Sequence, residues 1–451
     1  MEKIFNMDKS FIKKVIILAL PIVIQNFISS SLNIIDTMMI GKLGESEIAA
    51  VGIANQYFFM LNILMMGLFS GIGIFISQYF GKKDEKNIKK LVGIGVVSAI
   101  ILGSVFTIFA QFTPEGIIGI FNKDKHVIEL GGQYLSVVSI SYIFTAITFN
   151  YGIASRCIER TSIPMIASAI GLVTNTILNY GFIFGNFNLP ALGVRGAAIA
   201  TLIARIVEFI IMVGYVYYSK NELAGNLKEL LSFDFKFIKR ISITVLPVVL
   251  NEGCWGLGSV MYNVIYGRIG TRAIASVQIA TTIIYLFMVI IFGLGSATLV
   301  MVGNQVGRGD EEKADEYGRN LIKLSCTIGI LIAIVLALCA NKVVSIYDVS
   351  EQVKSWAKLI IYVTCIVMVM RVYNIIVVVG VLRGGGDVKV SFLIEALTMW
   401  CIGVPFALIG AFVLKLPVYL VYALCTFEEI TKSIACFKRI KSRKWIKNLV
   451  S

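Results

Sequence analysis

The chain has 451 residues, of which 57% are hydrophobic and only 15% are charged. Soluble domains carry about 45–50% apolar and about 25% charged residues, so this chain lacks the charges that a water-facing surface needs. It is therefore expected to be a membrane protein. The formal net charge of +14 does not indicate a nucleic-acid partner, because no segment forms a soluble basic face.

Twelve apolar runs are long enough to cross a bilayer, which takes about 20 mostly apolar residues per helix. Short polar breaks separate the runs, and no room remains for a sizeable soluble domain. We therefore predict an all-α membrane protein with twelve transmembrane helices. The runs are centred on residues 21–36, 57–75, 93–109, 135–153, 164–184, 197–216, 246–262, 274–302, 321–338, 359–381, 392–411 and 418–434.

The basic residues predict the orientation of these helices. With the N-terminus inside, the inside segments hold most of the 41 Lys and Arg residues, as cytoplasmic loops usually do. We therefore expect a multi-pass protein of a bacterial-type plasma membrane, the cell inner membrane, with both termini in the cytoplasm. In the tail, residues 438–451, Ile440, Trp445 and Ile446 alternate with basic residues, which suits a helix lying on anionic lipid.

The two halves of the chain repeat at an offset of about 226 residues. Gly41-Lys-Leu-Gly44 recurs as Gly267-Arg-Ile-Gly270, and Pro21 in Ala-Leu-Pro maps to Pro247 in Val-Leu-Pro. Because the offset covers six helices, both halves have the same orientation in the membrane. The repeat predicts two pseudo-symmetric six-helix lobes around a central cavity, as in a transporter. The predicted parts are an N-terminal lobe 1–218, a cytoplasmic linker 219–240, a C-terminal lobe 241–437 and the basic tail 438–451.

Several motifs occur in order along the chain. The first three are the Ala-Leu-Pro21 start, the Asp36-x-x-x-x-Gly41-x-x-Gly44 end of the first span, and Pro164 after Arg160. The others are the run from Leu192 to Thr201, Leu-Gly-Val-Arg-Gly-Ala-Ala-Ile-Ala-Thr, and the run from Leu382 to Asp387, Leu-Arg-Gly-Gly-Gly-Asp. Together these motifs resemble the MATE family, the multidrug and toxic compound extrusion transporters. This resemblance covers essentially the whole chain and implies export of organic cations.

Asp36 is the leading candidate for ion coupling. A charge inside a membrane costs about 2.5–3.5 kcal/mol, so a persistent one usually faces a cavity or a partner. At 1.5 Å per residue from Lys14, Asp36 lies roughly 33 Å along the first span, in its outer third. Desolvation there favours the protonated carboxyl, which can exchange its proton for a cation. The alternative is a structural carboxylate that caps a helix or bonds to Asn and Thr.

The resemblance also implies the neighbours of this acid. The family pattern brings Asn175, position 179 and Thr201 beside Asp36, and the corresponding acid in MATE proteins is implicated in proton or cation coupling. Where many relatives carry a second acid, this chain has Asn179. The site therefore holds less negative charge, which favours protons over sodium. No metal is expected beyond a monovalent cation at Asp36.

The second half offers a different set of charges. Glu252 lies near the midplane of the seventh span and resembles the acid of the NorM-type branch, whose partner is an aspartate in span 10. Here span 10 presents Arg371 instead. Two readings stay open: Glu252 is a substrate or ion ligand, or it pairs with Arg371. Elsewhere, Arg205 and Glu208 are three residues apart and are expected to pair, and Glu395 reaches either Arg371 or the cytoplasmic rim.

Candidate cavity residues are polar, aromatic or Met side chains within the spans. Polar groups avoid lipid, and Met and aromatic groups adapt to apolar cations. The same residue types are also common in packed helices, which is the competing interpretation. The cavity candidates are Gln56, Tyr142, Gln278 and Met288, and Asn55 and Asn62 share their chemistry.

The sequence thus predicts a secondary antiporter that exports cationic amphipathic drugs or toxins by alternating access, in exchange for protons or sodium ions. It has no Walker A pattern and no hydrolase constellation, so we expect no enzyme activity and no cofactor other than the coupling ion. The alternative is a lipid-linked oligosaccharide flippase of the same architecture. Small cationic organic substrates and membrane lipid are the expected partners, and a monomer is the expected state.

Overall fold

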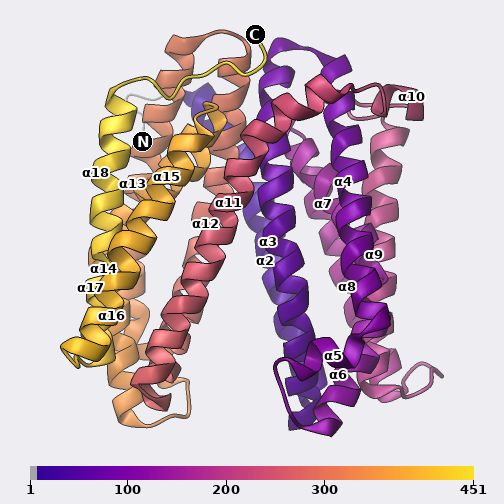
Figure 1. Ribbon diagram of the computed structural model, residues 1–451, viewed down its shortest axis with the longest axis vertical. Coiled ribbons are helices and arrows are strands. Elements are labelled where there is room, and N and C mark those ends of the chain that lie inside the picture. Colours follow the sequence, from indigo (N-terminus) through magenta and orange to yellow (C-terminus); the bar gives the residue numbers. More distant parts are fainter. Residues whose placement is uncertain (1–7) are drawn as a thin grey trace. The chain divides into compact units, whose positions relative to one another are not determined.

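The computed structural model describes residues 8–451, and this part of the chain is helical with short connections. It divides into two compact units, Leu20–Val245 and a second unit that joins Leu246–Ser451 to the start of the first helix, up to Ala19. Figure 1 traces the helices of each unit along the sequence.

The helices of the first half are long, as the apolar runs predict. Six crossings are formed by α2, α3, α4, α6 with α7, α8 and α9. The crossing made of α6 and α7 bends by 52°. The bounds are α2 Lys9–Gly41, α3 Glu45–Lys82, α4 Glu85–Phe112, α5 Pro114–Gly119, α6 Lys125–Val138, α7 Ser141–Cys157, α8 Ser162–Phe184, α9 Gly193–Tyr218 and α10 Leu227–Leu230.

The second half repeats this pattern with three π-helical segments inside its described helices. Such segments widen the helix by one residue per turn and are frequent at functional sites. The bounds are α11 Phe235–Ile269, α12 Thr271–Gly307, α13 Glu311–Ser345, α14 Glu351–Ile375, η1 Ile376–Leu382, α15 Val388–Thr398, η2 Met399–Gly403, α16 Val404–Leu408, η3 Ile409–Val413, α17 Val418–Cys425 and α18 Phe427–Lys441.

The number of membrane crossings agrees with the prediction. In residues 8–451, ten helices are long and apolar enough to span a membrane, or eleven when the bent α6–α7 pair counts as one. The remaining predicted span, 418–434, is formed by α17 and α18, which meet at Thr426. Neither helix alone is long enough to cross a membrane, because α17 has 8 residues and α18 has 15.

The sequence repeat produces equivalent helix starts in the two halves. Gly44 precedes α3 with φ of 156°, and Gly270 precedes α12 with φ of 148°, a conformation that side chains disfavour. Asp84 accepts a hydrogen bond from the backbone N–H of Asn87 at the start of α4. Asp310 makes the equivalent bond at the start of α13. The repeat therefore specifies local structure as well as helix order.

The sequence predicts the boundary between the two lobes in the segment 219–240. In the structure, the chain passes from one unit to the other within α2 and within α11, next to Pro21 and Pro247. The start of α2 packs in the second unit, where the rings of Phe11 and Tyr317 lie 5.1 Å apart. The start of α11 packs in the first unit, where Arg240 donates a hydrogen bond to the Tyr79 hydroxyl. Polar composition marks a loop, but these contacts between distant segments decide the units.

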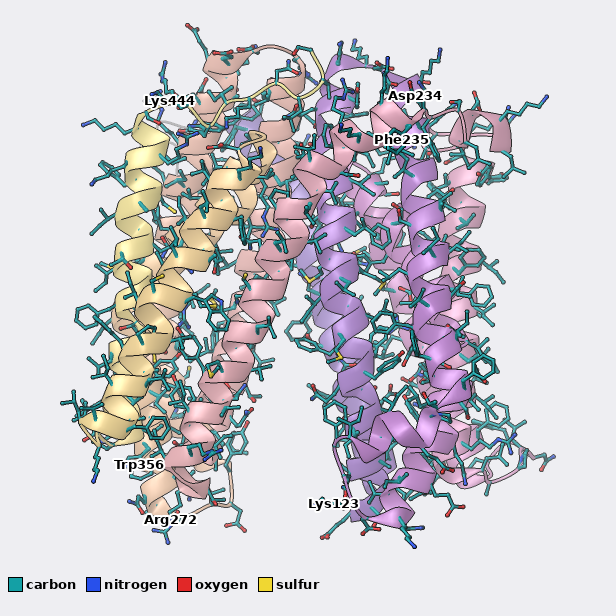
Figure 2. All side chains as sticks on the ribbon, viewed as in Figure 1. Lys123, Asp234, Phe235, Arg272, Trp356 and Lys444 are labelled. Carbon is teal, nitrogen blue, oxygen red and sulfur yellow. The ribbon has the colours of Figure 1, made fainter. Side chains whose placement is uncertain are left out.

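Connections alternate between the two ends of each unit, as the topology requires. In the first unit, Lys123 lies at the end opposite Asp234 (Figure 2). In the second unit, Arg272 and Trp356 lie at the end opposite Lys444 (Figure 2). The side of the membrane that each end faces stays a prediction from the basic residues.

Candidate functional site

A cavity of about 420 Å³ opens within the first unit. Its wall combines Asp36 with amides, hydroxyls and aromatic rings from α2, α3, α6, α7 and α9, so it suits a ligand that is both charged and apolar. Thr201 and Tyr142, two of the residues predicted from sequence, also line it. The remaining lining residues are Leu32, Asn33, Thr37, Ile40, Ile48, Val51, Gly52, Asn55, Phe58, Phe59, Asn62, Tyr134, Val138, Ser141, Thr145 and Arg205.

The four residues predicted to surround the coupling ion lie together. The side-chain nitrogen of Asn179 donates to Oδ1 of Asp36 at 2.6 Å and to Oδ1 of Asn175 at 2.9 Å. Asn175 in turn donates to the Thr201 hydroxyl at 3.2 Å. Helices α2, α8 and α9 each supply part of this chain of hydrogen bonds. It gives the carboxylate a neutral hydrogen-bond partner, and no cation is hydrogen-bonded to it among the described residues.

The side-chain oxygen of Asn179 is a buried acceptor that receives no hydrogen bond from the described residues. Asn179 is fully buried, and its Oδ1 has no hydrogen-bond partner among the described residues. A buried acceptor without a partner costs about 1–3 kcal/mol. A proton on the neighbouring Asp36, or a small cation beside it, would satisfy this oxygen. Within the described residues, no group of three or more His, Cys, Asp or Glu is placed to hold a metal.

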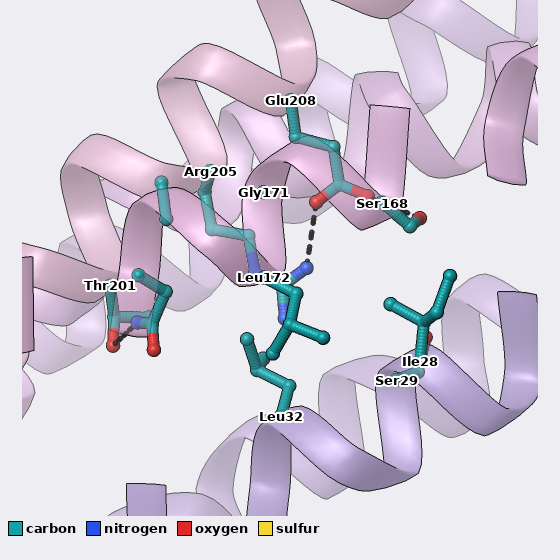
Figure 3. A pocket seen from close by; sticks show the side chains of 11 residues that line it. Ile28, Ser29, Leu32, Ser168, Gly171, Leu172, Thr201, Arg205 and Glu208 are labelled. Atoms are coloured by element: carbon teal, nitrogen blue, oxygen red, sulfur yellow. Dashed lines mark hydrogen bonds and ion pairs between the residues drawn. The ribbon is translucent and has the colours of Figure 1, made fainter. Parts of the chain in front are cut away.

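Arg205 and Glu208 form the ion pair predicted from their spacing, with 2.8 Å between Arg205 NH1 and Glu208 Oε2 (Figure 3). The Ser168 hydroxyl donates to the other Glu208 oxygen at 2.7 Å. Gln25 then donates to Ser168, and Arg156 donates to Gln25 at 2.6 Å. A polar chain therefore runs through the unit from the cavity wall. Arg205 lines both the large cavity and the smaller one drawn in Figure 3.

The large cavity also presents aromatic rings and two unpartnered hydroxyls. The hydroxyls of Tyr142 and Thr145 are buried without hydrogen-bond partners among the described residues, and the rings of Phe58 and Tyr142 lie 5.4 Å apart. The predicted residue Gln56 is exposed and is not part of the wall of this cavity, whereas Asn55, one position earlier on α3, is part of it.

The two cavity candidates of the second unit occupy ordinary helix positions. Gln278 is exposed and donates a hydrogen bond to Asn263 at 3.2 Å. Met288 is buried in the apolar core, 3% exposed. The burial of Met288 therefore favours the interpretation that it is a packing residue of the core. Residue type alone does not tell a helix face in a core from one on a cavity.

The proposed pair of Glu252 with Arg371 is wrong. Glu252 pairs with Arg383, with 2.7 Å between Arg383 NH2 and Glu252 Oε1. Arg371 pairs with Glu429 on α18, with 3.1 Å between Nε and Oε1. Counting residues from a helix end gives depth but not the direction that a side chain faces. Arg383 is itself buried, with 2% of its surface exposed.

Three charged residues of α18 were overlooked as intramembrane groups. Lys432 Nζ lies 2.8 Å from Glu395 Oε1 and 2.8 Å from Glu428 Oε1, so Glu395 reaches neither Arg371 nor the rim. Glu428, Glu429 and Lys432 all fall inside the predicted span 418–434. Three charges within five positions of an apolar run were the signal that could have revealed this cluster.

The tail is docked on the protein and does not form the predicted interfacial helix. Helix α18 ends at Lys441, and Trp445 beyond it is 1% exposed. Asp387 is fully buried, and its two oxygens each lie 2.6 Å from a nitrogen of Arg439 or Lys447. The basic and aromatic pattern of the tail is compatible with binding to lipid. The tail instead contacts Asp387 and the turn at Gly385, which lie far from it in sequence, so the pattern alone does not predict this docking.

Comparison with known proteins identifies a family whose sequence model matches both halves of this chain. The MatE family model matches residues 21–181 and 247–409. An uncharacterized transporter, YisQ of Bacillus subtilis, is 22% identical over 97% of this chain and 96% of its own length. A probable multidrug resistance protein, NorM of Agrobacterium fabrum, is 25% identical over 89% of this chain and 88% of its own.

Solved structures share the fold over nearly the whole chain. One, described as the outward-facing conformation of a multidrug resistance MATE family transporter, has a TM-score of 0.87 at 20% identity and covers 96% of each chain. The MATE transporter VcmN of Vibrio cholerae in its bent form has a TM-score of 0.86 at 20% identity, over 97% of this chain and 99% of its own. At these identities the likeness concerns the fold.

Proposed function

Because this chain belongs to the MATE family of multi-pass membrane transporters, we propose that it exports cationic amphipathic compounds in exchange for protons. The observation that carries the proposal is the position of Asp36. Its carboxylate lies on the wall of a cavity of about 420 Å³ and accepts a hydrogen bond from the Asn179 amide, whose own oxygen has no partner in the part of the chain that the structure describes.

The cavity wall supports the class of substrate. Phe58, Phe59 and Tyr142 present rings beside Asp36, and aromatic faces attract organic cations at short range. The unpartnered hydroxyls of Tyr142 and Thr145 add hydrogen-bonding groups that can orient a ligand. The relatives from several bacteria that carry the name probable multidrug resistance protein agree with this substrate class.

Competition at one carboxylate supplies the coupling. The charge of Asp36 is neutralised either by a bound proton or by a nearby cationic substrate. Protonation removes the negative charge that attracts the substrate, so binding of one weakens binding of the other. A proton entering from outside therefore releases the substrate, and the protein returns to its inward-open state with Asp36 protonated. In that state Asp36 loses the proton as the next cation binds. Alternating access keeps the two events on opposite sides of the membrane.

The surroundings of Asp36 favour a proton over sodium. Sodium prefers several oxygen ligands around one ion, and a second carboxylate would strengthen such a site. Here Asn179 offers an amide, and its nitrogen already faces Asp36. One carboxyl proton needs only one acceptor, which the free oxygen of Asn179 provides.

Efflux from proteoliposomes tests the proposal. The purified protein is reconstituted with a fluorescent organic cation, and a pH gradient or a sodium gradient is imposed. We expect the pH gradient to drive efflux in the wild type and in Asp348→Asn, an exposed control acid, but not in Asp36→Asn. Efflux that survives Asp36→Asn would overturn the coupling role. Efflux driven by sodium alone would replace the proton by sodium in the proposal.

A further inference from the structure

Among the described residues, the buried charges around Lys432 are not evenly matched. Glu252 has Arg383, and Glu429 has Arg371, so each of these acids has its own cation. Lys432 is shared by two carboxylates, Glu395 and Glu428. Their side chains are 6%, 13% and 9% exposed, respectively.

One negative charge is therefore left over in a place shielded from water. An unmatched buried charge is strongly unfavourable, and such groups usually take up a proton instead of staying ionised. The hydrogen bonds indicate where the proton fits. Glu428 accepts from Lys432 on Oε1 and from the Tyr262 hydroxyl on Oε2, at 2.8 Å and 2.7 Å. Glu395 accepts from Lys432 on Oε1, and its Oε2 accepts no bond from the described residues.

The backbone is shaped to let this cluster form. Gly403 ends the π-helical segment η2, directly beside the bond between Tyr262 and Glu428. A Cβ on Gly403 would overlap the Tyr262 hydroxyl and lie 2.6 Å from Glu428 Oε2. Only a residue without a side chain permits that bond. The η2 segment supplies the local widening that places Gly403 there.

The internal repeat gives the cluster a functional position. At the offset of about 226, Asp36 on α2 maps to Tyr262 on α11. Thr201 and Arg205 on α9 map to positions one residue before Glu428 and Lys432 on α18. The cluster therefore lies at or next to the sequence positions of the second half that correspond to Asp36 and its neighbours in the first.

The other ionisable groups near the cluster are the ion pair of Arg371 with Glu429 and several Tyr and Cys side chains. They come from every helix that packs around it, and none supplies a further cation to Glu395 or Glu428 among the described residues. These groups are Tyr266 on α11, Arg371 on α14, Tyr422 and Cys425 on α17, and Glu429 and Cys436 on α18.

We propose that the second unit holds its own exchangeable proton, shared by Glu395 and Glu428 beside Lys432. The proton is carried by one of the two carboxyls, where an O–H bond forms as it is taken up and breaks as it leaves. With the proton bound, the three groups sum to zero charge. Without it, the site holds one negative charge. Only the link to transport rests on the proposed antiport, because proton binding is measurable on its own.

Infrared difference spectroscopy of the purified protein tests the binding step. A protonated carboxyl absorbs at its own C=O frequency, and its band titrates with pH. We expect Glu428→Gln and Glu395→Gln each to abolish one band, because the remaining carboxylate is then matched by Lys432. We expect Lys432→Met to strengthen it, because both carboxyls become protonated. These opposite effects separate proton binding from general damage to the fold.

Three controls complete the test. Glu429→Gln should leave the band in place, because Glu429 is ionised beside Arg371. Asp36→Asn should also leave it, which separates this site from the one in the first unit. Gly403→Ala should shift the band, since it displaces the Tyr262 hydroxyl. Spectra unchanged in both Glu428→Gln and Lys432→Met would overturn the proposal.

Transport then tells whether the proton moves in the cycle. In proteoliposomes, the protons counted per exported cation should fall by about half in Glu395→Gln, as one of two exchanging groups is removed. An unchanged ratio in a variant that has lost its infrared band would reject the transport role of this site. Loss of coupling in Asp36→Asn would still hold in that case, so the two proposals fail separately.

Discussion

The guanidinium of Arg205 lies 2.8 Å from the carboxylate of Glu208, on the wall of a cavity that also holds Asp36. The first unit thus places one cation near two carboxylates and pairs it with Glu208. Asp36 keeps the Asn179 amide as its hydrogen-bond partner. If Asp36 exchanges protons as proposed, Glu208 serves as a positioning residue by pairing with Arg205.

We expect Glu208→Gln to shift proton-driven export toward lower pH. Without its partner, Arg205 is free to turn to Asp36 and stabilise the carboxylate, so protonation needs a more acidic medium. The pH profile of efflux from proteoliposomes measures the shift. The double variant Arg205→Gln with Glu208→Gln removes both charges and should return the profile toward that of the wild type. A profile in the single variant that matches the wild type would contradict the role of Glu208.

The pair of Arg383 and Glu252 should be important for stability. Removing one partner of a buried ion pair leaves an uncompensated charge and costs about 3–5 kcal/mol. We expect Arg383→Gln to lower the unfolding temperature in detergent, and Glu252→Gln added to it to recover part of the loss. Arg443→Gln is the matched control, because Arg443 is 60% exposed in its pair with Asp315 and such pairs contribute about 1 kcal/mol or less. Equal losses in Arg383→Gln and the control would refute this account.

The residues around Asp36 could be predicted from sequence because several constraints coincide there. Polar side chains inside apolar runs are few, and the family pattern names which of them meet. Asn175, Asn179 and Thr201 accordingly lie in one hydrogen-bonded chain with Asp36. The pair of Arg205 with Glu208 followed from local spacing on one helix, which needs no knowledge of the fold.

The second unit could not be predicted in the same way, because its partners come from distant helices. Glu252 is paired with Arg383 across more than a hundred residues of sequence, and the direction of each side chain depends on how the helices pack. Arg371 likewise faces Glu429 on α18, a direction that its depth along the helix does not give.

Trp445 should hold the tail on the second unit. Its ring is buried, and a Cβ on Gly385 would overlap it. Replacing a buried Trp by Ala typically costs about 3–5 kcal/mol. We expect Trp445→Ala to expose residues 443–451 to limited proteolysis in detergent, whereas Ile446→Ala, at a half-buried position, should change cleavage little. Rapid cleavage of the tail in the wild type would show that the docking is not maintained.

The short helix α10 should lose protection in acid. Glu229 accepts a hydrogen bond from the backbone N–H of Asn226 at 2.9 Å while the Asn226 side chain accepts one from Glu229 N–H, so the two form a capping box. The backbone N–H of Asn226, and then the ammonium of Lys89, hold the pKa of Glu229 below its ordinary value of 4.5. A lowered pKa in the folded state means that the carboxylate stabilises α10 above that value. The contribution is lost as the pH falls through the lowered pKa.

Hydrogen exchange of the α10 amides across the acid range measures this loss. In the wild type, protection should decrease as the pH is lowered below about 4.5, after correction for intrinsic exchange rates. Glu229→Gln keeps the size of the side chain but has no proton to gain, so its protection should vary less with pH and should start from a lower level. Lys89→Met is the second comparison. It removes the weaker of the two causes and should keep most of the pH dependence, since the bond from Asn226 remains. A variant Glu229→Gln with the same pH dependence as the wild type would assign the acid loss to another group.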